Sequence, residues 1–117
     1  MDMPMDYSMC CQTVTVYRKT EKGIFRAEIP NCFLQLQEEK SYDRLGSVWD
    51  QKFLLVQPGE KQLVFPGDRV FAGVGPVIDA AEWPAFLPVR VPGLVEVAYT
   101  AVYCWQGHFC HTEAGRK

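Results

Sequence analysis

The chain has 117 residues, 48% of them hydrophobic and 22% charged, which is the composition of one ordinary globular domain. Twelve basic against fourteen acidic residues give a formal charge of −2, and the basic residues form no long run, which argues against tight binding to nucleic-acid phosphates. No apolar stretch approaches the roughly 20 residues of a membrane span. Residues 1–6 are acidic, unlike a signal peptide, so we expect a protein made and kept in the cytosol. The odd number of five cysteines then argues against a disulfide framework.

The first third of the chain predicts an arm followed by short strands. Residues 1–12 are expected to form a flexible arm, ordered only on contact with a partner. Alternating β-branched residues predict a strand over 13–18, which a polar loop connects to a second strand over 24–29. Pro30-Asn31 should break or bulge the ladder, because proline has no N–H to donate, and the strand resumes over 32–37.

The middle of the chain adds a long loop and further strands. The charged segment 38–47 is a loop long enough to serve as a contact, and 48–56 is the next strand, with Trp49 in the core. Two apolar runs over 63–65 and 70–72 then read as strands on either side of a sharp turn.

That turn is Pro66-Gly67-Asp68, and each of its residues suits a type II turn. Pro66 pre-sets φ at the first corner, Gly67 can adopt the positive φ required next, and Asp68 can bond to backbone amides just beyond it. From this pattern alone, replacing Gly67 with valine should cost more stability than replacing Asp68 with alanine, because valine resists positive φ.

The last third of the chain predicts a proline-rich excursion and a final hairpin. Residues 73–92 carry four prolines, so this segment allows at most one helical turn, at 79–83, and should pack over a barrel end or project from it. A long strand over 95–105 and a return strand over 108–113 follow, and 114–117 should fray.

Together these elements predict an all-β fold. We expect a small β-barrel or sandwich of six to eight mostly antiparallel strands, formed by a single domain over 13–113.

The sharpest local cluster of chemically active residues lies in the final hairpin. Cys104, His108, Cys110 and His111 are residue types that bind zinc, although their spacing matches no usual zinc motif. Cys104 and Cys110 should face each other across the hairpin, whereas the two histidines have opposite strand parity. A cysteine–histidine catalytic pair, with Glu113 nearby, would also need a pocket and oxyanion donors. We interpret the cluster as hairpin packing, with neither a metal site nor catalysis.

Other candidate motifs are also better explained by structure. Gly73 and Gly75 lack the third glycine and the downstream acid of a dinucleotide site, so they are interpreted as the bend before Pro76. Trp83 stands between Glu82 and Pro84 in the excursion and is a candidate interface residue.

The order of elements resembles a known group of structural proteins. A strand-forming start at 13–17 follows a short arm, a middle strand runs into Phe65-Pro-Gly-Asp-Arg-Val-Phe-Ala-Gly73, and a late strand ends the chain. This pattern is similar to the small neck proteins of tailed phages and Gram-positive prophages, called head-tail connector, head-closure or stopper proteins. The resemblance covers roughly residues 13–113, while the long excursion and the Cys-His hairpin depart from the pattern of that group.

The resemblance implies a structural role with no catalytic residues and no cofactor. Copies would form a ring between portal and tail in the virion neck, after synthesis in the bacterial cytoplasm, and DNA would pass nearby without specific binding. Contacts are then expected from the arm, the loop and the excursion, at Asp6, Tyr7, Asp43, Arg44 and Trp83.

Two alternatives stay open from the residues themselves. The first is a cytosolic β-barrel that binds a small molecule or peptide in a cavity lined by Trp49, Tyr99 and Tyr103. The second is a zinc-dependent or thiol enzyme that uses the Cys-His hairpin.

Overall fold

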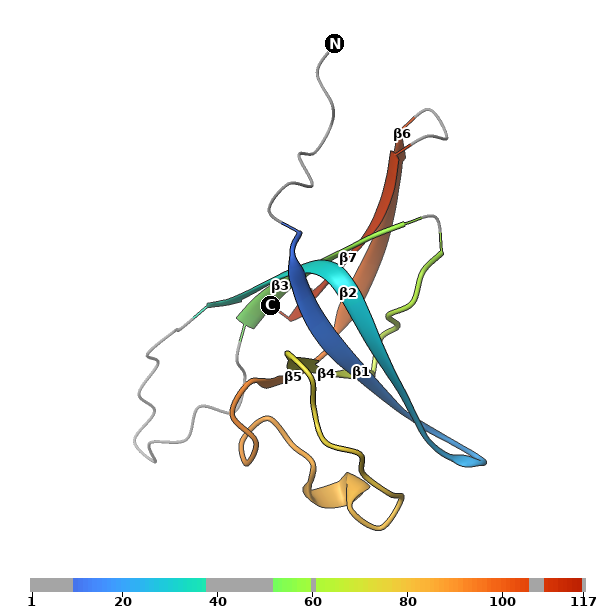
Figure 1. Ribbon diagram of the computed structural model, residues 1–117, viewed down its shortest axis with the longest axis vertical. Helices are drawn as coiled ribbons and strands as arrows, with labels where there is room; N and C mark the ends of the chain where they lie inside the picture. The colour runs from blue at the N-terminus through green and yellow to red at the C-terminus, as the bar shows by residue number, and fades with distance from the viewer. Residues whose placement is uncertain (1–9, 38–51, 60, 106–108, 117) are drawn as a thin grey trace.

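Seven antiparallel strands form one sheet in the computed structural model, which describes residues 10–37, 52–59, 61–105 and 109–116 (Figure 1). The strand order is β5-β4-β1-β2-β3-β7-β6. The described residues include one short 3-10 helix, η2, and none of their helices is long and apolar enough to cross a membrane. The predicted all-β fold is confirmed. The elements are β1 (Gln12–Thr20), β2 (Gly23–Gln37), β3 (Lys52–Pro58), β4 (Arg69–Ala72), η2 (Trp83–Ala85), β5 (Leu94–Glu96), β6 (Tyr99–Trp105) and β7 (Phe109–Arg116).

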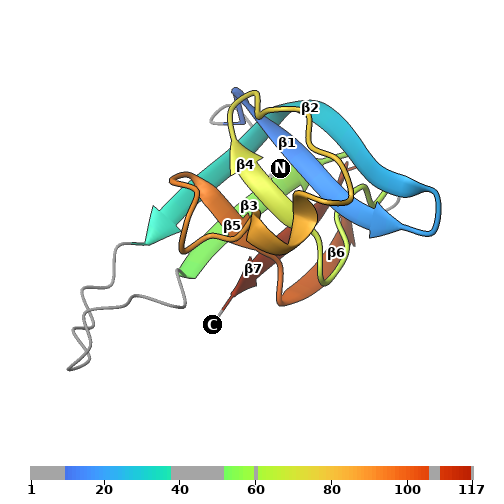
Figure 2. The same ribbon diagram turned by 90° about the horizontal axis from the view of Figure 1, so that it is seen from below.

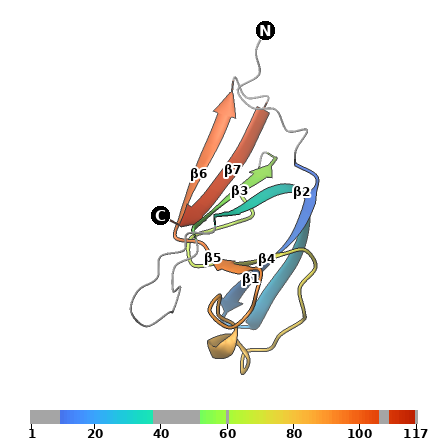
Figure 3. The ribbon, with the colours of Figure 1, turned by 90° about the vertical axis from the view of Figure 1, so that its left-hand side faces the viewer.

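The long strand β2 connects the two halves of the sheet. Its first half pairs with β1 and its last five residues pair with β3. Between them the register against β1 slips by one residue, and Asn31 adopts a positive φ of 58°. The predicted bulge at Pro30-Asn31 is therefore confirmed. Because a bulge bends its strand, β2 curves from one half of the sheet into the other (Figures 1 and 3).

The main core lies between these two halves. Apolar side chains from six strands meet there, together with Val64 from the segment that leads to β4 and Val97 from the segment between β5 and β6. Their burial is the principal force holding the halves together, since each buried aliphatic side chain contributes about 1.5–3 kcal/mol. The buried members are Val14, Val16, Ile29, Cys32, Leu34, Phe53, Leu55, Val64, Val70, Val95, Val97 and Ala114.

A second, smaller core forms where the proline-rich excursion packs back against the sheet. Ile78 and Phe86 of the excursion contact Tyr17 and Leu94 on the face of the sheet opposite the main core. Tyr17 is fully buried and donates its hydroxyl to the carbonyl oxygen of Pro76 at 2.6 Å. The excursion therefore packs on the molecule and does not project from it. Figure 2 views the molecule from this side.

Three predicted boundaries were wrong. Residues 63–65 are not a strand, because side chains satisfy their amides: Gln57 Oε1 accepts from Leu63 N at 3.1 Å, and Asp68 Oδ2 accepts from Phe65 N at 2.9 Å. The predicted strand over 95–105 is split, since Val97 leaves the ladder to exchange hydrogen bonds with the turn before β4. The helical turn includes Pro84, which is tolerated in the first turn of a helix.

The end of the chain also differs from expectation. Residues 114–116 were expected to fray, but they belong to β7 and pair with β3 on one side and, at Ala114 and Gly115, with β6 on the other. Ala114 is fully buried in the main core. Pairing on both sides is what keeps this end ordered. Of the predicted arm over 1–12, residues 1–9 lie outside the described residues, and Gln12 belongs to β1. The predicted loop 38–47 also lies outside them.

Cys32, at the bend of β2, is fully buried in the main core. Burial raises the pKa of its thiol from the usual 9.0 to about 12, and the neighbouring Cys10 acts in the same direction. The folded protein therefore keeps this thiol protonated under conditions in which an exposed thiol ionises.

This burial should make folding sensitive to alkaline pH. Below pH 9 the contribution of Cys32 is fully present, and above it the free energy of unfolding should fall by about 1.4 kcal/mol per pH unit, because only the unfolded thiol ionises until the pH approaches 12. Urea titrations on either side of pH 9 would measure the fall, and Cys32→Ala should show a smaller one. An equal fall in both proteins would contradict this account.

Candidate protein-contact surface

The turn before β4 is anchored from both sides. Asp68 N donates to Phe65 O at 3.1 Å, and Gly67 has a φ of +90°, as a type II turn requires. Gly67 N also donates to Val97 O at 2.8 Å. The predicted turn is thus confirmed, and it is tied to the segment between β5 and β6.

The carboxylate of Asp68 connects this turn to β1. Arg18 Nε donates to Asp68 Oδ1 at 2.8 Å, and its terminal nitrogen donates to Oδ2 at 2.7 Å. The Asp68 side chain is only 2% exposed, whereas that of Arg18 is 32% exposed. The hydrogen bond with Asp68 raises the pKa of Arg18. The carboxylate also bonds back to Phe65 N, not onward as the turn pattern suggested.

Arg18 is also held by two aromatic rings. Its guanidinium carbon lies 5.1 Å from the ring centre of Phe25 and 4.7 Å from that of Phe65, within the range of cation–π attraction. Phe25 and Phe65 are 43% and 41% exposed, and neighbouring Leu63 is 42% exposed. An arginine fixed in orientation thus stands among three large apolar side chains that water still reaches.

These residues form a groove between β2 and the segment before β4, with a volume of about 390 Å³. One wall is the row Phe25, Ala27 and Ile29 on β2, and the other carries Leu63 and Phe65. Arg18 lies between the walls, and we call this feature the Arg18 groove. Large apolar side chains around an arginine are typical of protein interfaces.

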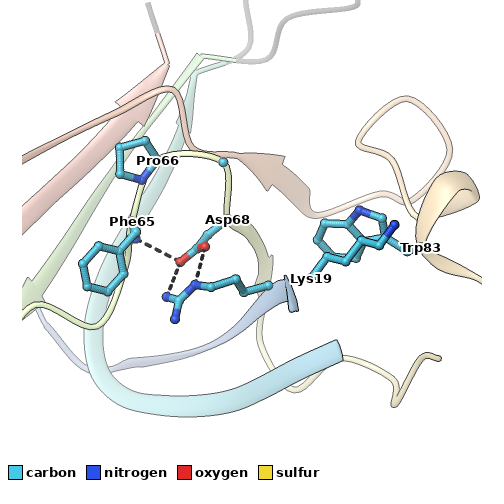
Figure 4. A pocket seen from close by; sticks show the side chains of 7 residues that line it. Lys19, Phe65, Pro66, Asp68 and Trp83 are labelled. Atoms are coloured by element: carbon cyan, nitrogen blue, oxygen red, sulfur yellow. Dashed lines mark hydrogen bonds and ion pairs between the residues drawn. The ribbon is translucent and has the colours of Figure 1, made fainter. Parts of the chain in front are cut away.

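A second hollow lies on the other side of Arg18. It has a volume of about 460 Å³ and extends from the turn at Pro66 past Lys19 to Trp83 (Figure 4). The Trp83 ring lies 3.8 Å from the guanidinium carbon of Arg69, which donates to Trp83 O at 2.6 Å and Phe86 O at 2.7 Å. Burial lowers the pKa of Arg69, and Glu96 partly offsets this effect. Trp83 therefore fastens the excursion to β4 as well as lining this hollow.

The predicted Cys-His cluster is only partly brought together. Cys104 and Cys110 pair across β6 and β7, as expected. His111 is buried, lies 3.0 Å from Glu113 Oε2 and stacks on Tyr103 with ring centres 5.2 Å apart. Within the described residues, no three His, Cys, Asp or Glu side chains are grouped as metal ligands would be. His108 lies outside those residues.

The remaining candidates are either outside the described residues or exposed. Asp6, Tyr7, Asp43, Arg44 and Trp49 belong to the first group. Tyr99 and Tyr103, expected to line a cavity under the binding-module hypothesis, are instead 39% and 50% exposed on β6.

The residues of the Arg18 groove were missed by the sequence reasoning. The pattern predicts a strand over 24–29 without placing Phe25 at a surface, and it predicts a strand over 63–65. The available signal was Asp68, because an aspartate between two apolar runs needs a partner if it is buried. Which side chains surround that pair depends on contacts between residues about 40 to 50 positions apart.

Comparisons with known proteins give no match: no family model, no curated protein and no solved structure is similar to this chain.

Proposed function

We propose that this chain is a structural, non-enzymatic protein of the head-tail connector of a tailed bacteriophage or prophage. Copies assemble as a homo-oligomeric ring that joins the portal of the filled head to the tail. The Arg18 groove is the observation that supports a role in protein assembly. The pattern around Pro66-Gly67-Asp68 supports the choice of the phage neck among protein assemblies.

The groove suits a protein contact for a physical reason. Phe25, Leu63 and Phe65 are each more than 40% exposed, so covering them would remove further apolar surface from water. Asp68 and the two rings already orient Arg18, so little side-chain freedom would be lost when a partner binds. Pre-organised aromatic and arginine side chains are the usual anchors of interfaces.

The proposal also specifies partners and location. The chain is made in the bacterial cytoplasm and becomes part of the virion neck, where it contacts the portal or its adaptor and the tail. DNA passes nearby without specific binding, in keeping with a net charge of −2. A ring contact is heterologous, so each copy uses two different surfaces.

Deletion of the gene from its phage or prophage provides the test. We expect DNA-filled heads without attached tails, visible by electron microscopy, and the wild-type chain should restore complete particles and be found in them. Phe65→Ser should restore far fewer particles. Val77→Ser is the matched control, because Val77 is 80% exposed but does not line the groove, and it should restore them fully. Normal particles without the gene would contradict the proposal.

A further inference from the structure

One edge of β2 is open along the Arg18 groove. Residues 23–29 and Cys32 of β2 pair with β1 on one side, but β3 pairs only with residues 33–37 on the other. Among the described residues, no strand pairs with the β3 side of β2 over 24–30. Strand edges of this kind accept an added strand from another chain.

The side chains beside this edge are those of the first groove wall, and they would form the apolar floor under an added strand. Phe25, Ala27 and Ile29 alternate along β2, so they share one face, and their row leads from exposed Phe25 to Ile29, which is only 7% exposed in the main core. Across the groove, Leu63 and Phe65 form the opposite wall. A strand added here would place every second side chain on this floor.

The first seven residues of the chain have the chemistry to fill the groove. Met1, Met3 and Met5 alternate with Asp2, Pro4 and Asp6. Methionine adapts to irregular apolar surfaces and makes favourable contacts with aromatic rings. If the methionine amides face β2, Pro4 has the opposite parity, so its missing N–H falls on the far side of the added strand.

Charge favours the same occupant. Residues 18–28, which form the β1–β2 hairpin beside the groove, carry four basic and two acidic side chains, whereas residues 1–7 carry two acidic side chains and no basic one. An acidic strand and a basic hairpin attract each other, most strongly at low salt.

We propose that residues 1–7 of a second copy of the chain bind in the Arg18 groove as an added β-strand, with Met3 and Met5 on the apolar floor. The proposal deepens the ring assembly proposed above and depends on it: the groove is one of the two surfaces that a heterologous contact needs, and the N-terminal segment is the other. Repeated around a ring, the contact leaves no groove open.

The positions of the methionines make this contact testable in the full-length chain. All four methionines, at positions 1, 3, 5 and 9, lie in the N-terminal segment. Methyl-¹³C-methionine labelling therefore reports on that segment alone. As concentration rises and light scattering shows association, Met3 and Met5 methyl signals should shift through the ring currents of Phe25 and Phe65. Isotope-filtered spectra of mixed labelled and unlabelled copies should show contacts between these methyls and groove residues.

Variants separate this contact from other modes of association. Met3→Ser combined with Met5→Ser should raise the concentration needed for association by about tenfold or more, corresponding to about 1.4 kcal/mol. Met9→Ser, outside the alternating run, should leave it unchanged. Phe65→Ser, with folding checked by circular dichroism, should abolish the methyl shifts.

Three results would overturn the inference. In the first, the chain stays monomeric and the methyl signals do not shift. In the second, the chain associates but the methyl signals still do not shift. In the third, the shifts are already complete in dilute monomer, which would place the segment in the groove of its own chain. None of them bears on whether deletion of the gene leaves heads without tails, so failure of this contact is distinguishable from failure of the proposed function.

Discussion

Asp68→Ala is expected to lower the free energy of unfolding by about 3 kcal/mol, because removing the buried carboxylate takes a hydrogen-bond acceptor from both the half-buried Arg18 guanidinium and Phe65 N. The variant loses both bonds to Arg18 and the bond that Asp68 Oδ2 accepts from Phe65 N. The turn before β4 would then lose its side-chain tie to β1 and would keep only the backbone pairing of β1 with β4 that begins at Arg69. Urea denaturation followed by tryptophan fluorescence measures the difference.

Two comparisons test the reason for this loss. Glu28→Ala removes an ion pair with Arg26, but Glu28 is 46% exposed, so that variant should unfold nearly as the wild type does. Combining Asp68→Leu with Arg18→Met should recover part of the stability lost in Asp68→Ala, because no half-buried guanidinium is then left without its carboxylate. If Asp68→Ala and Glu28→Ala were equally stable, the buried pair would not be what holds the turn.

Gly115→Ala should cost about 2 kcal/mol or more, since overpacking a closely packed site forces the backbone to move. Gly115 lies between β3 and β6, and a methyl group there would come within 2.8 Å of the carbonyl oxygen of Phe53 and 2.6 Å of the Tyr99 hydroxyl. The Tyr99 side chain can move, but the Phe53 oxygen belongs to the β3 backbone. The thermal midpoint of unfolding would report the loss.

Gly73→Ala provides the contrast, because its cost has a different origin. A methyl group at Gly73 would meet nothing within 4 Å, but the residue has a φ of +97°. We expect a loss of about 1–2 kcal/mol from backbone strain alone.

Adding Tyr99→Leu should rescue Gly115→Ala only partly, since the Phe53 oxygen remains. Full rescue would mean that the tyrosine is the sole obstacle.

The structure changes the order of the two turn substitutions. The sequence pattern ranks Gly67→Val above Asp68→Ala in cost, and the φ of +90° at Gly67 confirms that valine would be strained there. However, a Cβ atom at Gly67 would meet nothing within 4 Å, so we expect backbone strain of about 1–3 kcal/mol to be the main cost. Asp68 holds a pair that joins residues 50 positions apart. We therefore expect Asp68→Ala to match or exceed Gly67→Val.

Features that depend on near neighbours could be predicted from the amino-acid sequence alone. Alternating β-branched residues predict strands, Pro66 and Gly67 predict a type II turn, and Pro30 predicts a bulge, because each depends on backbone preferences within a few residues. The facing of Cys104 and Cys110 follows from the same local register.

Only the tertiary structure decided which surfaces are covered. Thr15 and Tyr17 alternate with Val14 and Val16 as a solvent-facing row would, yet both are buried, because the excursion packs over them. The Arg18 groove exists because β2 bends away from β3 at the bulge while Asp68 draws the turn toward β1. Burial depends on what the rest of the chain places against a residue, and strand periodicity carries no information about that.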